Sequence, residues 1–103
     1  MKFSDKIYTL LKKVPIGKVT TYKELAHATG CDAYIAVGQV LKKNPDAPNI
    51  PCHRVVATNG TIGGFNGFKT GPNIDRKKSM LEHEGIVFDG DKVVDFEKKL
   101  YKF

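Results

Sequence analysis

Apolar residues recur every three or four positions over several stretches of the chain, which predicts a mainly helical protein. The first such stretch follows Ser4, a good N-cap, so a helix is expected from about Asp5 to Lys13. A later helix is expected from about Asn73 to Glu84, ended by Gly85. The first helix carries a single apolar stripe, expected to face the core: Phe3, Ile7, Leu10, Leu11 and Val14.

The middle of the chain predicts two short helices separated by a glycine turn. Thr21 and Glu24 have the spacing of a capping box, and the helix that they begin is expected to stop at Gly30. Asp32 is expected to cap the next helix, which ends before the Asn44-Pro45 pair. Two short helices in this arrangement indicate a helix-turn-helix.

Two β-hairpins are expected in the second half of the chain. The first runs out over residues 54–57 and returns over 61–62, in the manner of a wing beside a helix-turn-helix. The second occupies residues 86–94, and Asp95 is expected to cap a short last helix. The predicted fold class is therefore α+β, mainly helical, with residues 1–103 forming a single winged helix-turn-helix-like domain with short β-hairpins.

Composition narrows the range of functions. The 103 residues suffice for one modest core, and no linker or repeat divides them. Seventeen Lys and Arg against eleven Asp and Glu give a net charge of +6, which suits nucleic acid as a partner or simply keeps a small protein soluble. No apolar run is long enough for a signal peptide or a membrane span. We therefore expect a cytoplasmic monomer, or a nuclear one in a eukaryote, that does not bind membranes and keeps Cys31 and Cys52 as thiols.

The basic residues are unevenly placed. Lys42 and Lys43 end the predicted third helix, and Arg54 lies two residues after Cys52. A second group follows downstream: Lys69, Arg76, Lys77 and Lys78. Together these side chains could line one track of phosphates.

The segment Ile50-Pro51-Cys52-His53-Arg54-Val55 places a thiol beside an imidazole. A thiol is a weak nucleophile until it loses its proton, and a neighbouring histidine favours that loss. Cys52 is therefore the first candidate for chemistry. From these residues alone, a small buried Cys52 beside a hydrogen-bonded core His53 is the commoner case and is the favoured interpretation. No metal-ligand spacing is visible.

The segment IPCHRVV, residues 50–56, resembles the active-site signature of the O6-alkylguanine-DNA alkyltransferases, which are suicide DNA-repair proteins. Flanking stretches are similar as well: GKVTTYKELA, AVG, KNP, NGTIGG, GFNG and LEHEG. The likeness runs from about Val14 to Val87 and so covers most of the chain. It implies the DNA-binding, cysteine-bearing domain of the family, without the separate N-terminal domain that many members carry.

The resemblance also implies roles for individual residues. Cys52 corresponds to the acceptor that attacks and keeps the alkyl group, with no cofactor. His53 resembles the base that takes the thiol proton through a water, and Glu84 resembles the carboxylate that orients this base. Tyr22 matches the tyrosine that meets the phosphate of the flipped nucleotide and protonates the leaving guanine. Asn44 resembles the asparagine that braces the turn near the active site.

Further positions concern the substrate. The carbonyls of Cys52 and Val55 are expected to meet the exocyclic amine of guanine, and Phe65-Asn66-Gly67 to close the pocket, although many relatives have a tyrosine where this chain has Phe65. Ile35 occupies the position of an arginine that usually fills the space of the extruded base. Either Ile35 or Tyr34 could act as an apolar wedge, or Ile35 could have a plain role in the core or on the surface.

The function implied is direct reversal of damage in double-stranded DNA that carries O6-alkylguanine: one base is flipped and its alkyl group passes to Cys52 in a single turnover. One alternative is an alkyltransferase-like protein that flips the base only to mark it for other repair. Such proteins typically have tryptophan where this chain has Cys52. A third possibility is a winged-helix transcription regulator, for which Cys52, His53 and Glu84 have no reason to converge.

Overall fold

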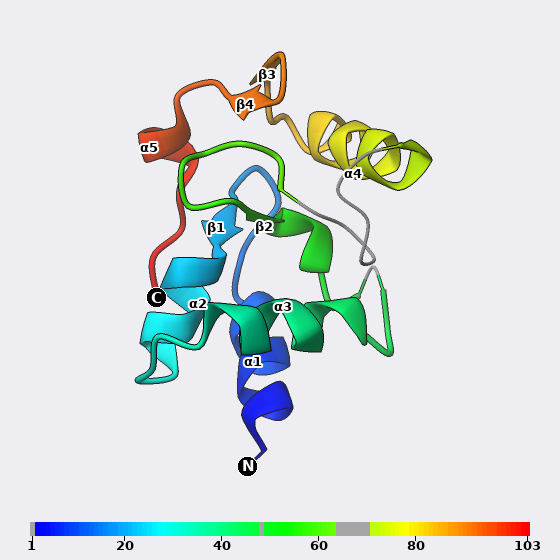
Figure 1. The fold of residues 1–103 in the computed structure, drawn as a ribbon. Helices are drawn as coiled ribbons and strands as arrows, with labels where there is room; N and C mark the ends of the chain where they lie inside the picture. Colours follow the sequence, from blue (N-terminus) through cyan, green and yellow to red (C-terminus); the bar gives the residue numbers. More distant parts are fainter. Residues whose placement is uncertain (1, 48, 64–70) are drawn as a thin grey trace.

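The computed structural model describes residues 2–47, 49–63 and 71–103 (Figure 1). The helices are α1 (Phe3–Leu11), α2 (Tyr22–Ala28), α3 (Tyr34–Lys42), α4 (Pro72–His83) and α5 (Phe96–Lys99), with a 3₁₀ helix, η1, at Cys52–Arg54. The strands are β1 (Thr20–Thr21), β2 (Val55–Val56), β3 (Phe88–Asp89) and β4 (Lys92–Val93). The predicted class, a mainly helical α+β fold with a helix-turn-helix, is confirmed.

Three of the predicted helix boundaries are confirmed by local geometry. The Oγ1 atom of Thr21 accepts a hydrogen bond from the backbone N–H of Glu24 at 3.1 Å, so Thr21 caps α2. Gly30 and Gly85 follow the ends of α2 and α4 with φ of +82° and +93°. Glycine reaches these values at little cost, which is why the helices stop there.

Other predicted caps are wrong. Lys2 is the N-cap of α1, and its backbone N–H donates to the Asp5 carboxylate, so Ser4 lies inside the helix. Ala33 is the N-cap of α3, and the carboxylate of Asp32 lies 3.2 Å from Nε2 of His27. Asp95 precedes α5 as expected but makes no side-chain capping bond.

The predicted pairing of the first hairpin is wrong, whereas the second hairpin is confirmed. β2 pairs in parallel with β1, with Thr20 opposite Val55. The return segment bridges to Lys92 through Thr61, although the turn is closed by a hydrogen bond from Ala57 N–H to Thr61 O. Val55 and Val56 are 1% and 0% exposed, so both faces of β2 are buried, in agreement with its parallel pairing to β1. β3 and β4 pair antiparallel.

The β1–β2 pair lies between two apolar clusters. One joins α1, α2, α3 and the Cys52 segment: Ile7, Leu11, Leu25, Ala26, Val37, Leu41, Ile50, Cys52 and Val55. The other joins α4 to the C-terminal hairpin: Val19, Val56, Leu81, Ile86 and Val93. In Figure 1, α1 and α3 lie below the strand pair, and α4 and the hairpin lie above it. No helix of the described residues is long and apolar enough to cross a membrane.

Candidate active site

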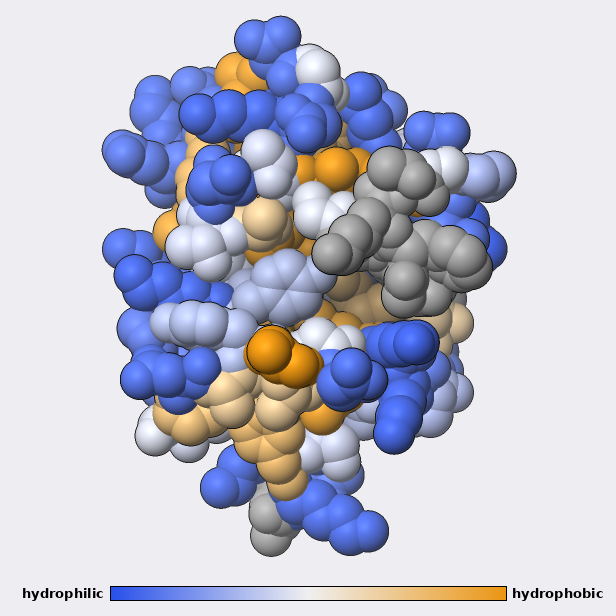
Figure 2. Space-filling view, viewed as in Figure 1, coloured by the Kyte–Doolittle hydropathy of each residue, from blue (hydrophilic) through white to orange (hydrophobic). Residues whose placement is uncertain are grey.

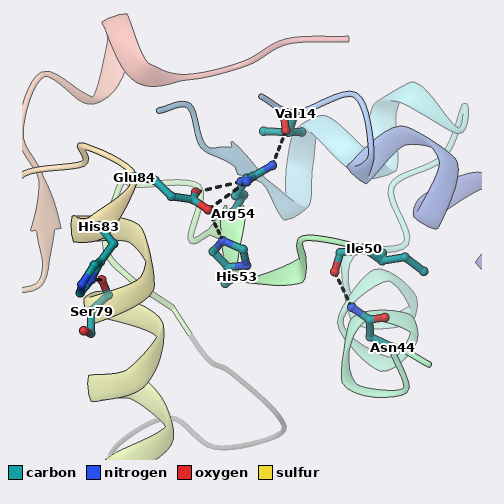
Figure 3. A network of polar contacts seen from close by, with 8 residues as sticks. All are labelled: Val14, Asn44, Ile50, His53, Arg54, Ser79, His83 and Glu84. Atoms are coloured by element: carbon teal, nitrogen blue, oxygen red, sulfur yellow. Dashed lines mark hydrogen bonds and ion pairs between the residues drawn. The ribbon is translucent and has the colours of Figure 1, made fainter. Parts of the chain in front are cut away.

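Cys52 begins η1, and its position is fixed by the strand pairing and by Asn44. In the parallel β1–β2 pair, Cys52 lies shortly before the start of β2, whereas Tyr22, which follows β1, lies level with the end of β2. Asn44 donates from Nδ2 to the Ile50 carbonyl at 2.7 Å (Figure 3). Its Oδ1 accepts from Asp46 N–H at 2.9 Å. Cys52 itself is 7% exposed. These two bonds place Asn44 against the loop that precedes Cys52, where the resemblance expects it to brace the turn.

His53, Arg54 and Glu84 form one hydrogen-bonded cluster (Figure 3). Nε2 of His53 lies 2.9 Å from Oε2 of Glu84. Arg54 binds the same carboxylate with two nitrogens, Nε to Oε1 and Nη2 to Oε2, both at 2.9 Å. Its Nη1 donates to the Val14 carbonyl at 2.8 Å. The carboxylate at the end of α4 therefore holds both residues that follow Cys52.

Burial and pairing set the protonation states of this cluster. Burial lowers the pKa of His53, an effect larger than the opposing influence of the Glu84 hydrogen bond and charge. Burial alone would raise the pKa of Glu84, but hydrogen bonds and charges from Arg54 and His53 hold it below its ordinary value. At neutral pH, Glu84 is thus ionised and His53 neutral. Because Nε2 then donates to the carboxylate, Nδ1 is the basic nitrogen of His53.

Tyr22, at the start of α2, is partly buried close to the thiol. Burial raises the pKa of Tyr22, and the negative charge of ionised Cys52 raises it further. A protonated phenol is a hydrogen-bond donor, so Tyr22 can give a proton near Cys52. Gly63, with φ of +70°, lets the chain pass beside this ring: a Cβ at Gly63 would lie 3.7 Å from the Tyr22 hydroxyl and 3.2 Å from Ala57 N.

Two basic residues that were expected on the surface, in contact with phosphates, are largely or fully buried. The side chain of Arg54 is 13% exposed, and its guanidinium donates hydrogen bonds to the Glu84 carboxylate and the Val14 carbonyl. Arg54 therefore stabilises the site from within the protein. Lys77 is fully buried, and its ammonium donates to the carbonyls of Val55 and Ile62. Lys42 and Lys43, by contrast, are exposed at the end of α3, in agreement with a surface role.

The candidate wedge residues lie apart from the buried cluster. Tyr34 and Ile35 begin α3 and are 43% and 83% exposed. Figure 2 shows hydrophobic surface between hydrophilic groups on the face of the molecule that α3 occupies. A core role for Ile35 is therefore excluded. Phe65, Asn66 and Gly67 lie outside the described residues, as does Lys69.

The burial of Lys77 is the feature of the site that sequence reasoning missed, yet a signal for it existed. Ile74, Lys77, Leu81 and Glu84 are spaced by three, four and three residues, which places them on one face of α4. Leu81 is fully buried and Ile74 packs against the first apolar cluster. A lysine between them had to point inward, beside the strand that follows Cys52.

Comparison with known proteins shows which family shares this sequence. The family profile described as the DNA-binding domain of 6-O-methylguanine DNA methyltransferase matches residues 2–86. The chain is 42% identical over 84 residues to a methylated-DNA–protein-cysteine methyltransferase of Saccharolobus islandicus, covering 82% of this chain and 51% of that protein. It thus spans about half the length of that relative, and the expectation of no separate N-terminal domain stays a prediction.

Two further relatives match nearly the whole chain. A DNA base-flipping protein of Escherichia coli is 32% identical over 102 residues, covering 98% of this chain and 75% of that protein. The structure of Schizosaccharomyces pombe Atl1 in complex with damaged DNA containing O6-carboxymethylguanine has a TM-score of 0.80 and 28% identity, with 100% of both chains covered. Since the profile covers most of the chain, this protein belongs to the 6-O-methylguanine DNA methyltransferase family and carries its DNA-binding domain.

Proposed function

We propose that this chain repairs O6-alkylguanine in double-stranded DNA by transferring the alkyl group, once, to Sγ of Cys52. The observation that supports this most is the position of Cys52. It packs with the helix-turn-helix on one side and is followed directly by His53, whose imidazole is held by Glu84. A nucleophile, a base and a group that orients the base therefore lie together beside a DNA-binding element.

In the proposed first step, Nδ1 of neutral His53 takes the thiol proton of Cys52 through an intervening water. Nε2–H of His53 keeps its bond to the Glu84 carboxylate, which favours the imidazolium that forms. Arg54 keeps this carboxylate ionised and fixed by two further bonds. The loss of the proton leaves a thiolate, which is the reactive form of the side chain.

In the transfer step, the thiolate attacks the alkyl carbon on O6 of guanine. The Sγ–C bond forms, the C–O6 bond breaks, and the electron pair of that bond stays on guanine. Tyr22 supplies a proton to the leaving guanine and recovers one from solvent. The product is a thioether on Cys52 that has no route back to the thiolate, so each molecule acts once.

The reacting carbon is stacked inside the duplex, so the base must be rotated out. The exposed start of α3 suits this task, since Tyr34 and Ile35 present apolar surface to the solvent, although the ring of Tyr34 also contacts that of His27 at 6.4 Å between centroids. Lys42 and Lys43, at the other end of the same helix, supply a sequence-independent attraction to phosphates.

A second candidate is base flipping without chemistry. It is favoured by the near-complete coverage of this chain by the Escherichia coli base-flipping protein and by Atl1. The retained thiol of Cys52 and the His53–Glu84 pair favour transfer over this candidate. The same 2.9 Å contact argues against a plain transcription regulator, whose function does not require a histidine held by a partly buried carboxylate.

Counting repaired bases per protein molecule tests the proposal. Duplex DNA carrying O6-methylguanine is incubated in excess, and the modified base remaining is quantified at completion. We expect one base repaired per molecule of the wild-type chain and none for Cys52→Ser, with duplex binding retained in both. Binding with no repair by the wild-type chain would favour the flipping candidate, and more than one repair per molecule would contradict the suicide mechanism.

A further inference from the structure

The C-terminal segment, residues 98–101, lies beside β1 as a further strand, and the proposed mechanism gives it no role. Val19, which precedes β1, is bridged in parallel to Leu100. The N–H of Val19 donates to the Lys99 carbonyl at 2.9 Å, and its carbonyl accepts from Tyr101 N–H at 2.7 Å. In Figure 1 this segment, drawn in red, runs down from α5 along β1.

Two side chains tie the same strand to the C-terminal segment. The fully buried Thr20 donates from Oγ1 to the Tyr101 carbonyl at 3.1 Å. Lys18 donates from Nζ to the Lys98 carbonyl at 2.8 Å. Four hydrogen bonds between these described residues therefore join the segment to residues 18–20. The segment lies beyond residue 86, where the match to the family profile ends.

β1 needs this second partner because its pairing with β2 is short. The two strands pair over two residues each, with Thr20 opposite Val55 and Thr21 opposite Val56. A two-stranded pair is marginally stable in water, and a third strand stabilises it. Val19 is fully buried, so its backbone N–H and carbonyl groups also need partners within the protein. The C-terminal segment supplies these partners on the edge of β1 that is opposite β2.

β1 leads directly into the residue that the proposed mechanism uses as its proton donor. Tyr22 is the first residue of α2 and follows Thr21, which ends β1 and caps the helix. The ring of Tyr22 packs against the apolar cluster that contains Cys52. It also lies beside Gly63, where an added Cβ would be 3.7 Å from the phenol hydroxyl. Because α2 begins where β1 ends, a shift of the strand also shifts the phenol.

We propose that the C-terminal segment positions Tyr22: by holding Val19 and Thr20 from the side opposite β2, it fixes β1 and with it the phenol at the start of α2. This rests on the proposed function for its use, since the phenol gives a proton to the leaving guanine there. Thr20 and Tyr101 act on the reaction through Tyr22, so they are positioning residues. The position of the ring can be measured without DNA.

Paired substitutions separate each hydrogen bond from the side chain at that position. Thr20→Val removes the Oγ1–H donor and keeps the branched shape, whereas Thr20→Ser keeps the hydroxyl. Tyr101→Pro removes the N–H that donates to Val19, whereas Tyr101→Ala keeps that N–H and likewise lacks the phenol ring. The single-turnover rate of transfer from duplex DNA carrying O6-methylguanine is measured for each variant, alone and combined with Tyr22→Phe.

We expect Tyr101→Pro to transfer about tenfold more slowly than Tyr101→Ala, because a misplaced reacting group can slow a reaction by up to about 10²-fold. Thr20→Val should be slower than Thr20→Ser for the same reason. With Tyr22→Phe these differences should disappear, since the hydroxyl that would be misplaced is absent. Differences of the same size with and without Tyr22→Phe would assign the segment to fold stability alone and overturn the proposal. Equal rates within both pairs would overturn it as well.

Nuclear Overhauser contacts report the position of Tyr22 without DNA and without alkyl transfer. In the wild-type chain, the ring protons of Tyr22 should contact the α protons of Gly63, and Thr20→Val and Tyr101→Pro should both weaken these contacts. Contacts between β3 and β4 are the control and should stay. Unchanged Tyr22–Gly63 contacts in the folded variants would contradict the proposal.

Thr20→Val exchanges one buried hydroxyl for a methyl group, so it keeps the test decisive if Tyr101→Pro does not fold. A wild-type chain that transfers no alkyl group, while its variants displace the ring of Tyr22, would count against the proposed function and not against the positioning of Tyr22. A wild-type chain that transfers, with variants that match it in rate and in contacts, would count against the positioning alone.

Discussion

Cys52 lies between two regions that are built in different ways. On one side, His53, Arg54, Glu84 and Lys77 are mostly or fully buried, and each makes hydrogen bonds to groups that are distant in the sequence. On the other side, the residues proposed to meet DNA are exposed on α3. Substitutions in the buried cluster should therefore affect stability and chemistry together. Substitutions on the exposed face should affect activity on duplex DNA and leave the fold intact.

The largest effect is expected at the base. His53→Gln keeps a donor for Glu84 but removes the basic nitrogen, so the single-turnover rate of transfer should fall by about 10²–10⁴-fold. His83→Gln is the control, because His83 is exposed beside Glu84 and bonds only the Ser79 carbonyl among the described residues. An equal loss of rate in both variants would contradict the role of His53.

Glu84→Gln should reduce the free energy of unfolding by about 2–4 kcal/mol, because it leaves the guanidinium of Arg54 without its carboxylate in a mostly buried position. The control is Glu82→Gln, an exposed acid on the same helix, which should change stability by less than about 0.5 kcal/mol. Urea unfolding followed by circular dichroism measures both. Equal stability of the two variants would show that the buried pair contributes little.

The same cluster should make the wild-type chain sensitive to acid. The folded-state pKa of Glu84 is lowered, so its stabilising contribution exists above its unfolded-state pKa and is lost as the pH falls through the lower, folded-state value. His53 acts in the same direction, because the unfolded chain takes up a proton at a pH where the buried imidazole does not. Stability should therefore fall below about pH 6.5 because of His53 and fall further below about pH 4.5 because of Glu84; the second fall should be weaker in Glu84→Gln. Parallel pH curves would contradict this.

On the exposed face, Ile35→Ala should slow transfer from duplex DNA by about 10-fold or more, since holding an extruded base out of the stack requires a few kcal/mol. Transfer from the free modified base needs no flipping and should keep its rate. Thermal unfolding should change little, because the side chain of Ile35 is 83% exposed. Tyr34→Ala is the companion variant. Proportional losses on both substrates would contradict the wedge.

The smallest effect is expected for the surface lysines. Lys42→Gln or Lys43→Gln should each flatten the dependence of log affinity on log salt by about 0.9 if the side chain neutralises one phosphate. Fluorescence anisotropy with a labelled duplex measures this slope. Unchanged slopes in both variants would remove these lysines from the interface and place the phosphate contacts on another surface.

The parts of the fold that depend on local chemistry were predictable from the sequence. The Thr21 cap and the stops at Gly30 and Gly85 each involve residues within one helical turn, and all three are confirmed. The pairing of β2 was not predictable in this way, because its partner β1 lies more than 30 residues earlier in the chain. Local turn signals around residues 58–60 favoured a hairpin, and the burial of both faces of β2 decided otherwise.

In the candidate site, too, some features were predictable from the sequence and others depend on residues far apart in the chain. The family resemblance placed His53 and Glu84 together, and the structure joins them. Arg54 and Lys77 were expected on the surface because most basic side chains lie there. Their acceptors, Glu84 for Arg54 and Val55 for Lys77, are 30 and 22 residues away, so charge alone could not reveal them. Only the spacing of Ile74, Lys77, Leu81 and Glu84 on α4 pointed inward.

Intact mass of the protein after incubation with duplex DNA carrying O6-methylguanine tests the central proposal most directly. If Cys52 is the acceptor, the wild-type chain gains the mass of one methyl group, located by peptide mapping on the segment that contains Cys52, and Cys52→Ser gains nothing. A wild-type chain that binds the duplex and keeps its original mass, or a methyl group found on Cys31, would contradict the account.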